Sequence, residues 1–402
     1  MRRDHPMLKR FLLILLLSIA LTTLVFIPFF MNAAKGIAFI SKGDGFSQLV
    51  PFQKYLYHQY THFRSFYDVS FGLGGDYTKG LSYYYATSPL LLLYFGIVYI
   101  GEQLFNLPAH SIQFWAANQI FLSYIRVVFT VLTSIYFFRY LNSNRFFVIL
   151  ATLMYAISVV TIYFNFTWSF YGDVLILLPL SLLGLERFFQ ARKIGLFIFA
   201  IAVTLFSNFY FSYYEFIILS FYTLYRIIWP YHKDIVQRVQ KLYLLIIAAV
   251  LSLMIASLGF YTGVSAVMAN DRQINPNLTL SLLIDFKEKY HMFSDGFYIT
   301  ISTLTFIALF AFRLYKHYFY RLFAILTWIM LIGSLTPYFD SFFNGFSLPA
   351  RRWVYILGLS SSVLIALFLL HLSEVSIKQY LYTALGCVVV MLYMYTQYDG
   401  NN

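Results

Sequence analysis

The sequence predicts an all-α protein that crosses a membrane many times. Of its 402 residues, 60% are hydrophobic and only 11% are charged, and the mean hydropathy is +0.71. A soluble core cannot bury that much apolar surface. The apolar residues recur in windows of about 20, the length of a spanning helix, and they lack the alternation typical of a β-barrel.

The first predicted helix follows a basic N-terminus. Four Lys and Arg residues within positions 1–10 precede the apolar run Phe11–Met31. This run is longer than the apolar segment of a typical signal peptide, although Ala33 and Ala34 would suit a cleavage site. We therefore interpret the run as an uncleaved helix whose N-terminus lies in the cytoplasm.

Residues 32–117 predict a long outer loop that contains interfacial helices. Phe46–Arg64 carries apolar side chains at helical spacing with polar ones between them, so it predicts an amphipathic helix. Such a helix could lie in the membrane interface or pack on the protein, and the sequence fits both. Leu90–Gly101 is apolar but short for a span. A long structured loop of this kind is usually functional.

The distribution of Lys and Arg decides whether Leu90–Gly101 crosses the membrane. If it does not, the segments assigned to the cytoplasm hold 17 of the 28 basic residues. The outer segments then hold 10, spread over far longer loops, and Arg126 lies within a helix. Because cytoplasmic loops are enriched in Lys and Arg, this count favours an interfacial or re-entrant helix at 90–104.

The other spanning helices follow from this assignment. They are expected at 118–139, 145–164, 172–189, 194–211, 213–229, 241–262, 297–314, 320–336, 352–372 and 377–396. With the first helix they make about eleven, in one transmembrane domain over residues 1–402. The main outer loops are then 32–117, 262–296 and 337–351.

Composition also limits the partners and cofactors. The net charge of +12 comes mainly from basic loops beside membrane ends, so we read it as topology and expect no nucleic acid. The single cysteine, Cys387, excludes a disulfide or a Cys-based metal site and is expected to be a membrane-buried thiol. The histidines show no ligand spacing, so no metal site is predicted, although a divalent cation remains possible.

Asp44 is the first candidate for chemistry. It lies between Gly43 and Gly45, a few residues beyond the first span. A positioned carboxylate near the outer membrane surface can take a proton from a hydroxyl group. An Asp-Gly pair is also an ordinary turn, so a structural role is the alternative. Asp76, after Gly72-Leu-Gly-Gly, is a second candidate for the substrate site, as a partner carboxylate or a metal ligand, again with a turn as the alternative.

Further candidates lie at other predicted outer ends of helices. Arg351 and Arg352 precede a helix on the outer side, where an Arg pair suggests an anionic ligand or contact with lipid head groups. Asn208 and Glu215 lie near an outer turn, and an acidic group at membrane depth suggests a functional site or an internal hydrogen bond. Asp173 is expected to cap the start of its helix.

The chain resembles the bacterial YfhO family of integral membrane proteins. The resemblance runs through most of the chain. The matching pieces are Gly43-Asp44-Gly45 with Gln48 and Pro51-Phe52, Gly72-Leu-Gly-Gly-Asp76, Tyr84-Tyr85, Ser88-Pro89, Asn208 with Tyr210 and Glu215, and Pro349 with Arg352-Trp353.

The family looks like the GT-C class of glycosyltransferases. This resemblance implies a multi-helix membrane domain, a large first outer loop with interfacial helices, and an acidic residue in that loop. It also implies a polyprenyl-phosphate-linked sugar as donor and a wall polymer such as lipoteichoic acid as acceptor, outside the bacterial cell. Family members are generally longer than this chain, which ends at Asn402 and is expected to be a fragment or a short form.

Two functions follow from these observations. The first is an inverting transferase in which Asp44 is the general base and Arg351 and Arg352 stabilise the leaving phosphate. The second is a transporter of lipid-linked sugar or polymer that changes no bond. Membrane-buried charges in broken helices would favour the transporter, and the sequence predicts few of them.

Overall fold

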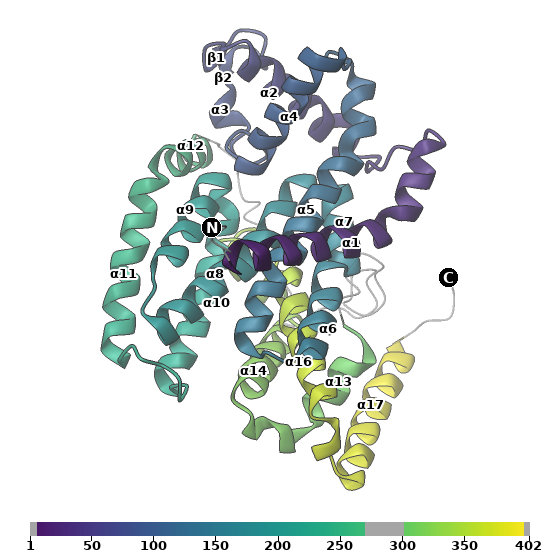
Figure 1. Ribbon diagram of the computed structural model, residues 1–402, viewed down its shortest axis with the longest axis vertical. Helices are drawn as coiled ribbons and strands as arrows, with labels where there is room; N and C mark the ends of the chain where they lie inside the picture. The colour runs from purple at the N-terminus through teal and green to yellow at the C-terminus, as the bar shows by residue number, and fades with distance from the viewer. Residues whose placement is uncertain (1–5, 270–300, 398–402) are drawn as a thin grey trace, which may run out of the picture. The chain divides into compact units, whose positions relative to one another are not determined.

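The computed structural model of the protein describes residues 6–269 and 301–397 (Figure 1). The chain divides into two compact units. Unit 1 comprises Met1–Phe137 and Thr161–Asp271, and unit 2 comprises Phe138–Val160 and Arg272–Asn402. The described parts are helical except for one short antiparallel ribbon, in which β1 (Tyr67–Asp68) pairs with β2 (Gly75–Asp76). The all-α prediction is confirmed.

Unit 1 begins with α1 (Pro6–Ala34) and the predicted first loop. The expected amphipathic helix is present as a short π-helix, η1 (Gly45–Leu49), continued by α2 (Val50–Thr61). The ribbon, α3 (Tyr77–Gly80) and α4 (Pro89–Phe105) follow, and Figure 1 shows all of them gathered beside α2. Tyr55 on α2 donates a hydrogen bond to Asp68 of the ribbon at 2.6 Å, and Tyr57 donates to Glu102 of α4. The loop is therefore a folded assembly.

The rest of unit 1 is a set of long helices. These are α5 (Ile112–Leu141), α7 (Val159–Thr167), η2 (Ser169–Tyr171), α8 (Gly172–Ala191), α9 (Gly195–Ser207), α10 (Phe209–Ile228), α11 (Arg238–Ile255) and α12 (Ser257–Met268). α8 and α9 approach closely at Gly184, where an added Cβ would lie 2.6 Å from the Cα of Phe197. Asn208 separates α9 from α10 and caps the latter.

An ionic network joins α8, α10 and α11 at one end. Arg226 contacts Glu186 at 3.2 Å and also binds Asp234, while Lys241 contacts Asp234 at 2.6 Å. All four side chains are at most 4% exposed. Because buried charges need partners, this network fixes the ends of the three helices relative to one another.

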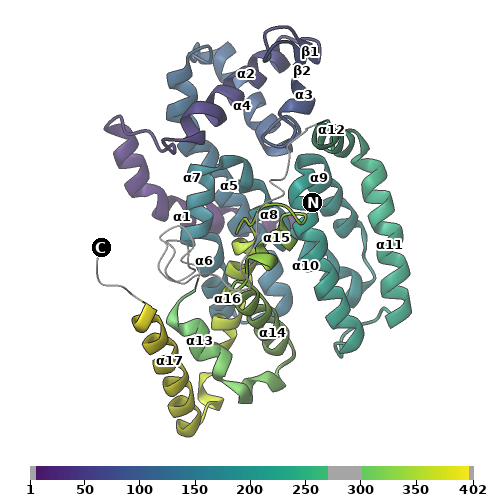
Figure 2. The same ribbon diagram turned by 180° about the vertical axis from the view of Figure 1, so that it is seen from behind.

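Unit 2 is built around one buried helix. Its helices are α6 (Arg145–Ala156), α13 (Thr303–Phe310), η3 (Phe312–Lys316), α14 (Tyr318–Gly333), α15 (Pro337–Phe343), α16 (Val354–Leu370), η4 (Leu372–Glu374) and α17 (Ile377–Gln397). α16 is buried from Val354 to Phe368 and packs against α6 and α14, with α13 also beside it (Figure 2). A hydrogen bond of 3.1 Å joins Thr327 of α14 to Ser360 of α16.

The helices bear out the membrane prediction in part. Five described segments are long and apolar enough to cross a bilayer, by length and composition. They are Leu8–Ala34, Ile112–Leu141, Arg145–Thr167, Ser169–Ala191 and Arg238–Ile255. A sixth arises if α14 and α15, which meet at a bend of 115°, count as one span.

The predicted number of eleven spans and the GT-C arrangement remain predictions. Each of the eleven predicted ranges falls on helical structure, although 297–314 begins outside the described residues. Several of these helices are short: α9 and α16 have 13 and 17 residues. α4, which we expect to stay at the interface, is also an apolar helix of 17 residues.

Most of the predicted outer loop 262–296 lies outside the described residues. The thiol of Cys387 is buried, as predicted.

Candidate functional site

The Asp44 turn is built by a close approach of the backbone to Ser41. The Ser41 hydroxyl accepts a hydrogen bond from the Gly45 N–H at 2.9 Å and donates one to the Thr167 carbonyl at 3.2 Å. A Cβ at position 45 would lie 2.4 Å from Ser41 Oγ and 2.8 Å from Ile40 Cγ2. A side chain at position 45 would therefore have to displace Ser41 and Ile40, and the turn places Asp44 directly before η1.

Asp44 differs from the other acidic residues that the structure describes. Its side chain is exposed, and its carboxylate accepts one long hydrogen bond, from Gln48 Nε2 at 3.4 Å. The other described carboxylates are buried or half-buried and are held by ion pairs, helix caps or hydroxyl groups. They are Asp68, Asp76, Glu102, Asp173, Glu186, Glu215, Asp234, Asp340 and Glu374. Asp44 is thus the carboxylate best placed to receive a proton from a bound molecule.

Gln48 connects Asp44 to an aromatic group. Tyr84 donates a hydrogen bond to Gln48 Oε1 at 3.1 Å, so the Gln48 amide bridges Asp44 and Tyr84. The Tyr84 ring packs against Phe52 and Phe170, with centroid distances of 5.2 and 5.3 Å. These contacts hold the amide in place and limit the orientations that the Asp44 carboxylate can adopt.

Asn208 contributes by positioning the same loop. Its Oδ1 accepts hydrogen bonds from the backbone N–H groups of Tyr210 and Phe211, which caps α10. Its Nδ2 donates to the Tyr83 carbonyl at 2.8 Å. Asn208 therefore ties the residue before Tyr84 to a long helix. Direct contact of Asn208 with a substrate stays a prediction.

Asp76 caps α3. Its Oδ1 accepts hydrogen bonds from the Thr78 and Lys79 N–H groups at 2.9 and 3.1 Å, and another from the Thr78 hydroxyl. This is the structural alternative that the sequence left open. Its Oδ2 makes no hydrogen bond within the described parts of the chain, so the predicted role in substrate binding is still open to experiment.

A buried ion pair between α5 and α8 was not predicted. Arg126 Nε donates to Asp173 Oδ1 at 2.9 Å, and the Arg126 side chain is fully buried. The other Asp173 oxygen accepts hydrogen bonds from Ser88 and Ser207. Gly172 leaves room for the arginine, since a Cβ there would lie 2.4 Å from Arg126 Cδ.

This ion pair contradicts the expectation that Asp173 caps its helix, and the sequence contains a signal for the pair. Asp173 lies in the first turn of α8, but its carboxylate binds Arg126 rather than capping the helix. An arginine within an apolar segment needs a counterion, because an unpaired charge at membrane depth is costly. Asp173 is an acidic residue at the predicted outer end of a neighbouring helix, and that signal was present in the sequence.

Glu215 is buried among three helices of unit 1. Its Oε2 accepts hydrogen bonds of 3.0 Å from Ser181 of α8 and from Thr204 of α9, while Glu215 itself belongs to α10. Its Oε1 has no hydrogen-bond partner in the described parts of the chain. The structure therefore provides the internal hydrogen bonds that the sequence offered as an alternative, and substrate binding by Glu215 stays a prediction.

The two candidate arginines, Arg351 and Arg352, lie in unit 2 and differ in their surroundings. Arg351 Nε donates to Asp340 Oδ2 at 3.1 Å, and Trp353 Nε1 donates to the other Asp340 oxygen at 2.8 Å. Arg351 also donates to the Ser334 carbonyl at 3.2 Å. Arg352 is half-buried, and α16 begins two residues later, at Val354. Arg351 thus has an internal counterion, and the binding of an external anion by Arg351 or Arg352 stays a prediction.

Comparison with known proteins agrees with the resemblance. The chain matches the family described as "Bacterial membrane protein YfhO" over residues 15–402. It is 30% identical over 389 residues to "Uncharacterized protein YfhO" of Bacillus subtilis (strain 168), covering 97% of this chain and 44% of that relative. The chain therefore spans less than half the length of this relative. No solved structure matches. On the length of the family match and this identity, the chain belongs to the YfhO family of bacterial membrane proteins.

Proposed function

We propose that the protein is a membrane glycosyltransferase with Asp44 as its general base. In this proposal it moves a sugar from a polyprenyl-phosphate donor to a wall polymer such as lipoteichoic acid, outside the cell. The proposal rests on the exposure and the position of the Asp44 side chain. Among the described carboxylates it is the exposed one, and it stands on a turn that Gly45 and Gln48 fix.

The proposed reaction inverts the anomeric centre. The acceptor hydroxyl gives its proton to Asp44, and its oxygen attacks the anomeric carbon on the face opposite the lipid phosphate. The bond between that carbon and the phosphate oxygen breaks, and the phosphate leaves with the electron pair. Arg352 belongs to unit 2, and its proposed role in binding the phosphate through two parallel hydrogen bonds is a separate prediction from the sequence.

The other site residues have supporting roles in this proposal. Asn208 holds the Tyr83 carbonyl, and Tyr84 holds Gln48, so both fix the group that orients Asp44. Asp76 shapes the same loop by capping α3. Arg351, bonded to Asp340, would support the segment that carries Arg352.

Mass spectrometry of wall polymers tests the proposal. Cells that lack the protein should lose a sugar decoration and accumulate the lipid-linked sugar. Asp44→Asn should lower the transfer rate by about 100- to 10,000-fold, the usual cost of losing a general base. Arg352→Lys should lower it markedly, because lysine keeps the charge but loses the two parallel hydrogen bonds.

Asp76→Asn is the companion test. Asparagine also caps helices, so this variant should fold, and its transfer rate should fall less than that of Asp44→Asn. All three variants must reach the membrane in amounts similar to wild type. If Asp44→Asn transferred sugar at the wild-type rate in purified form, Asp44 would not be the base. If no polymer changed on deletion, a transferase of this kind would be ruled out.

Transport of a lipid-linked sugar is the second candidate, and one observation favours it. Arg126 and Asp173 form a buried ion pair between two segments that are long and apolar enough to span a bilayer. Unit 2 also contains the bent pair α14–α15. Reconstituted vesicles separate the two functions. A transporter would move the labelled lipid-linked sugar across the bilayer with no new glycosidic bond, and Asp44→Asn would leave that movement unchanged.

A further inference from the structure

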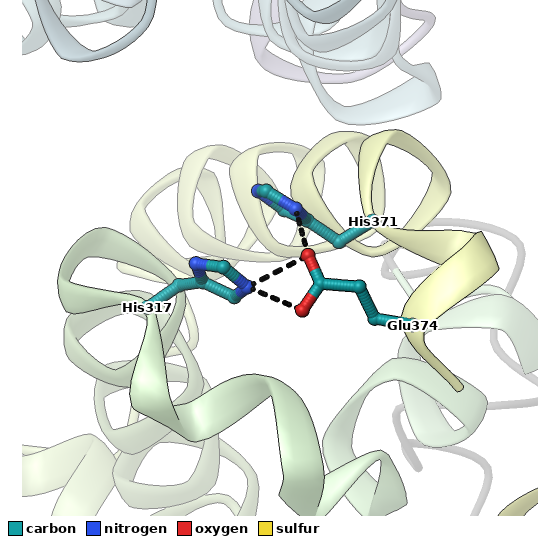
Figure 3. A group of neighbouring side chains, drawn as sticks. All are labelled: His317, His371 and Glu374. Carbon is teal, nitrogen blue, oxygen red and sulfur yellow. Dashed lines mark hydrogen bonds and ion pairs between the residues drawn. The ribbon is translucent and has the colours of Figure 1, made fainter. Parts of the chain in front are cut away.

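We propose that His317, His371 and Glu374 of unit 2 form a binding site for one Zn²⁺ ion. The proposed transferase reaction uses none of these residues. His317 immediately precedes α14, His371 immediately follows α16, and Glu374 ends η4. Figure 3 shows both imidazole rings directed at the Glu374 carboxylate. The fold thus brings together three metal-ligating groups from two turns that are far apart in the sequence.

The ligand atoms have nearly the spacing of a zinc site. His317 Nε2 lies 3.1 Å from each Glu374 oxygen, and His371 Nδ1 lies 2.8 Å from Oε1. One ligand atom from each residue lies within 4.8 Å of the other two. Zinc bonds of about 2.0–2.2 Å at tetrahedral angles place ligands roughly 3.3–3.5 Å apart. The nitrogen–oxygen distances are therefore a few tenths of an ångström shorter than those around a zinc ion.

The set of ligands and its exposure agree with zinc. Two imidazoles and one carboxylate form the three-ligand set of zinc sites that keep a fourth position for water. The side chains of His317, His371 and Glu374 are 32%, 24% and 29% exposed, which gives an ion and a water molecule access. The two rings are stacked, with centroids 3.9 Å apart and planes at 18°, so one ring must turn for both nitrogen lone pairs to point at a single ion.

Lys316 fixes which carboxylate oxygen faces the ion. Its Nζ contacts Glu374 Oε2 at 2.6 Å. Oε1, the oxygen near both rings, is then left at the point where the three ligands converge. Partners of this kind orient metal ligands in many proteins. A bound ion would join the start of α14 to the end of α16, and the charge distribution assigns both turns to the cytoplasmic side.

Zinc binding by the purified full-length protein tests the proposal. Protein stripped with EDTA is titrated with Zn²⁺ in competition with a chromogenic chelator, and one equivalent should bind. Co²⁺ in place of Zn²⁺ should give the visible absorption of a tetrahedral site. His371→Ala and Glu374→Gln should each weaken Zn²⁺ binding by at least about 10-fold, since changes in the outer shell alone typically cost 10- to 100-fold.

A second histidine pair provides the control. His58 of α2 and His62, which directly follows α2, are also stacked, with centroids 4.3 Å apart, but among the described residues they are not part of a three-ligand group. Their double replacement by alanine should leave Zn²⁺ binding unchanged. The elution volume on size exclusion shows whether each variant is folded, and His317→Gln replaces His371→Ala if the latter is not.

Three outcomes would overturn the zinc proposal. They are no binding at micromolar Zn²⁺, binding that is unchanged in Glu374→Gln and His371→Ala, and binding that depends on His58 and His62. None of these measurements uses sugar transfer, so they stand apart from the test of the proposed function.

Discussion

Gly43 and Gly45 flank the same carboxylate but differ in the space around them. A Cβ at Gly45 would overlap Ser41 and Ile40, whereas nothing lies within 4 Å of a Cβ at Gly43, whose φ is not in the left-handed region. Gly45→Ala should therefore destabilise the turn by about 1–3 kcal/mol, as overpacking does, and lower the transfer rate. Gly43→Ala should be neutral or slightly stabilising.

Thermal unfolding in detergent and the transfer assay measure both glycine variants. The two substitutions are chemically identical, so a larger loss of stability at position 45 than at position 43 would come from the packing around Gly45. Equal effects at the two positions would mean that the packing at Ser41 does not hold the Asp44 turn.

The carboxylate of Asp68 makes the stability of unit 1 depend on pH. Hydrogen bonds from Tyr55 above all, and then from Ser70, lower the pKa of Asp68 from 3.8 to about 2. The folded loop thus favours the ionised carboxylate. Its contribution to stability is fully present above about pH 4 and is lost as the pH falls toward 2. Asp68→Asn should lower stability at neutral pH and flatten the acid dependence in this window.

Thermal unfolding between pH 5 and pH 2 checks the Asp68 prediction. Asp234→Asn is a poor comparison because it breaks a network of ion pairs, so Asp44→Asn serves as the control carboxylate. A slope that is the same for Asp68→Asn and wild type would show that Asp68 does not link the ribbon to α2.

At the scale of the helices, one buried ion pair, Arg126–Asp173, joins α5 to α8. Removing a single partner leaves an unpaired buried charge, which typically costs about 3–5 kcal/mol. We therefore expect Arg126→Met and Asp173→Asn each to destabilise the protein strongly. The double variant removes both charges, so it should be markedly more stable than the sum of the single effects predicts.

A double-mutant cycle on unfolding in detergent measures this coupling. Ser88 and Ser207 keep a hydrogen-bond acceptor in Asp173→Asn, whereas Arg126 then faces an NH2 group and loses its acceptor. Additive single effects would indicate that the two side chains do not stabilise each other.

For the whole molecule, the distribution of basic residues predicts the topology. Single cysteines at positions 79 and 233, in a Cys387→Ser background, report on the two sides. Lys79→Cys should react with an impermeant thiol reagent from outside, and Lys233→Cys should not. The reason is that the segment containing Lys233 is rich in Lys and Arg and is retained in the cytoplasm. Permeabilised cells, in which both should react, are the control.

Equal labelling of the two positions in intact cells would contradict the topology. It would mean that α4, an apolar helix of 17 residues, crosses the membrane after all. The proposed transferase requires Asp44 on the outer side, so this measurement also bears on the proposed function.

The sequence by itself determined the properties that depend on local patterns. Runs of apolar residues predicted the membrane class and the helices, and the Gly43-Asp44-Gly45 turn marked the carboxylate that the structure leaves exposed. The amphipathic helix ends at Thr61, three residues before the predicted end. These features are local because backbone hydrogen bonds and side-chain periodicity act over a few residues.

Only the tertiary structure decided which side chains meet. Arg126 and Asp173 are 47 residues apart in the chain, and Asn208 and the Tyr83 carbonyl are 125 apart. The His317–Glu374 contact, across 57 residues, likewise left no ligand spacing in the sequence. Two buried side chains from different helices meet only when the helices pack together. That packing depends on how the side chains fit along the whole length of both helices. Local patterns therefore predicted the helices of this protein, while packing determined the partners of Arg126, Arg351 and the two stacked histidines.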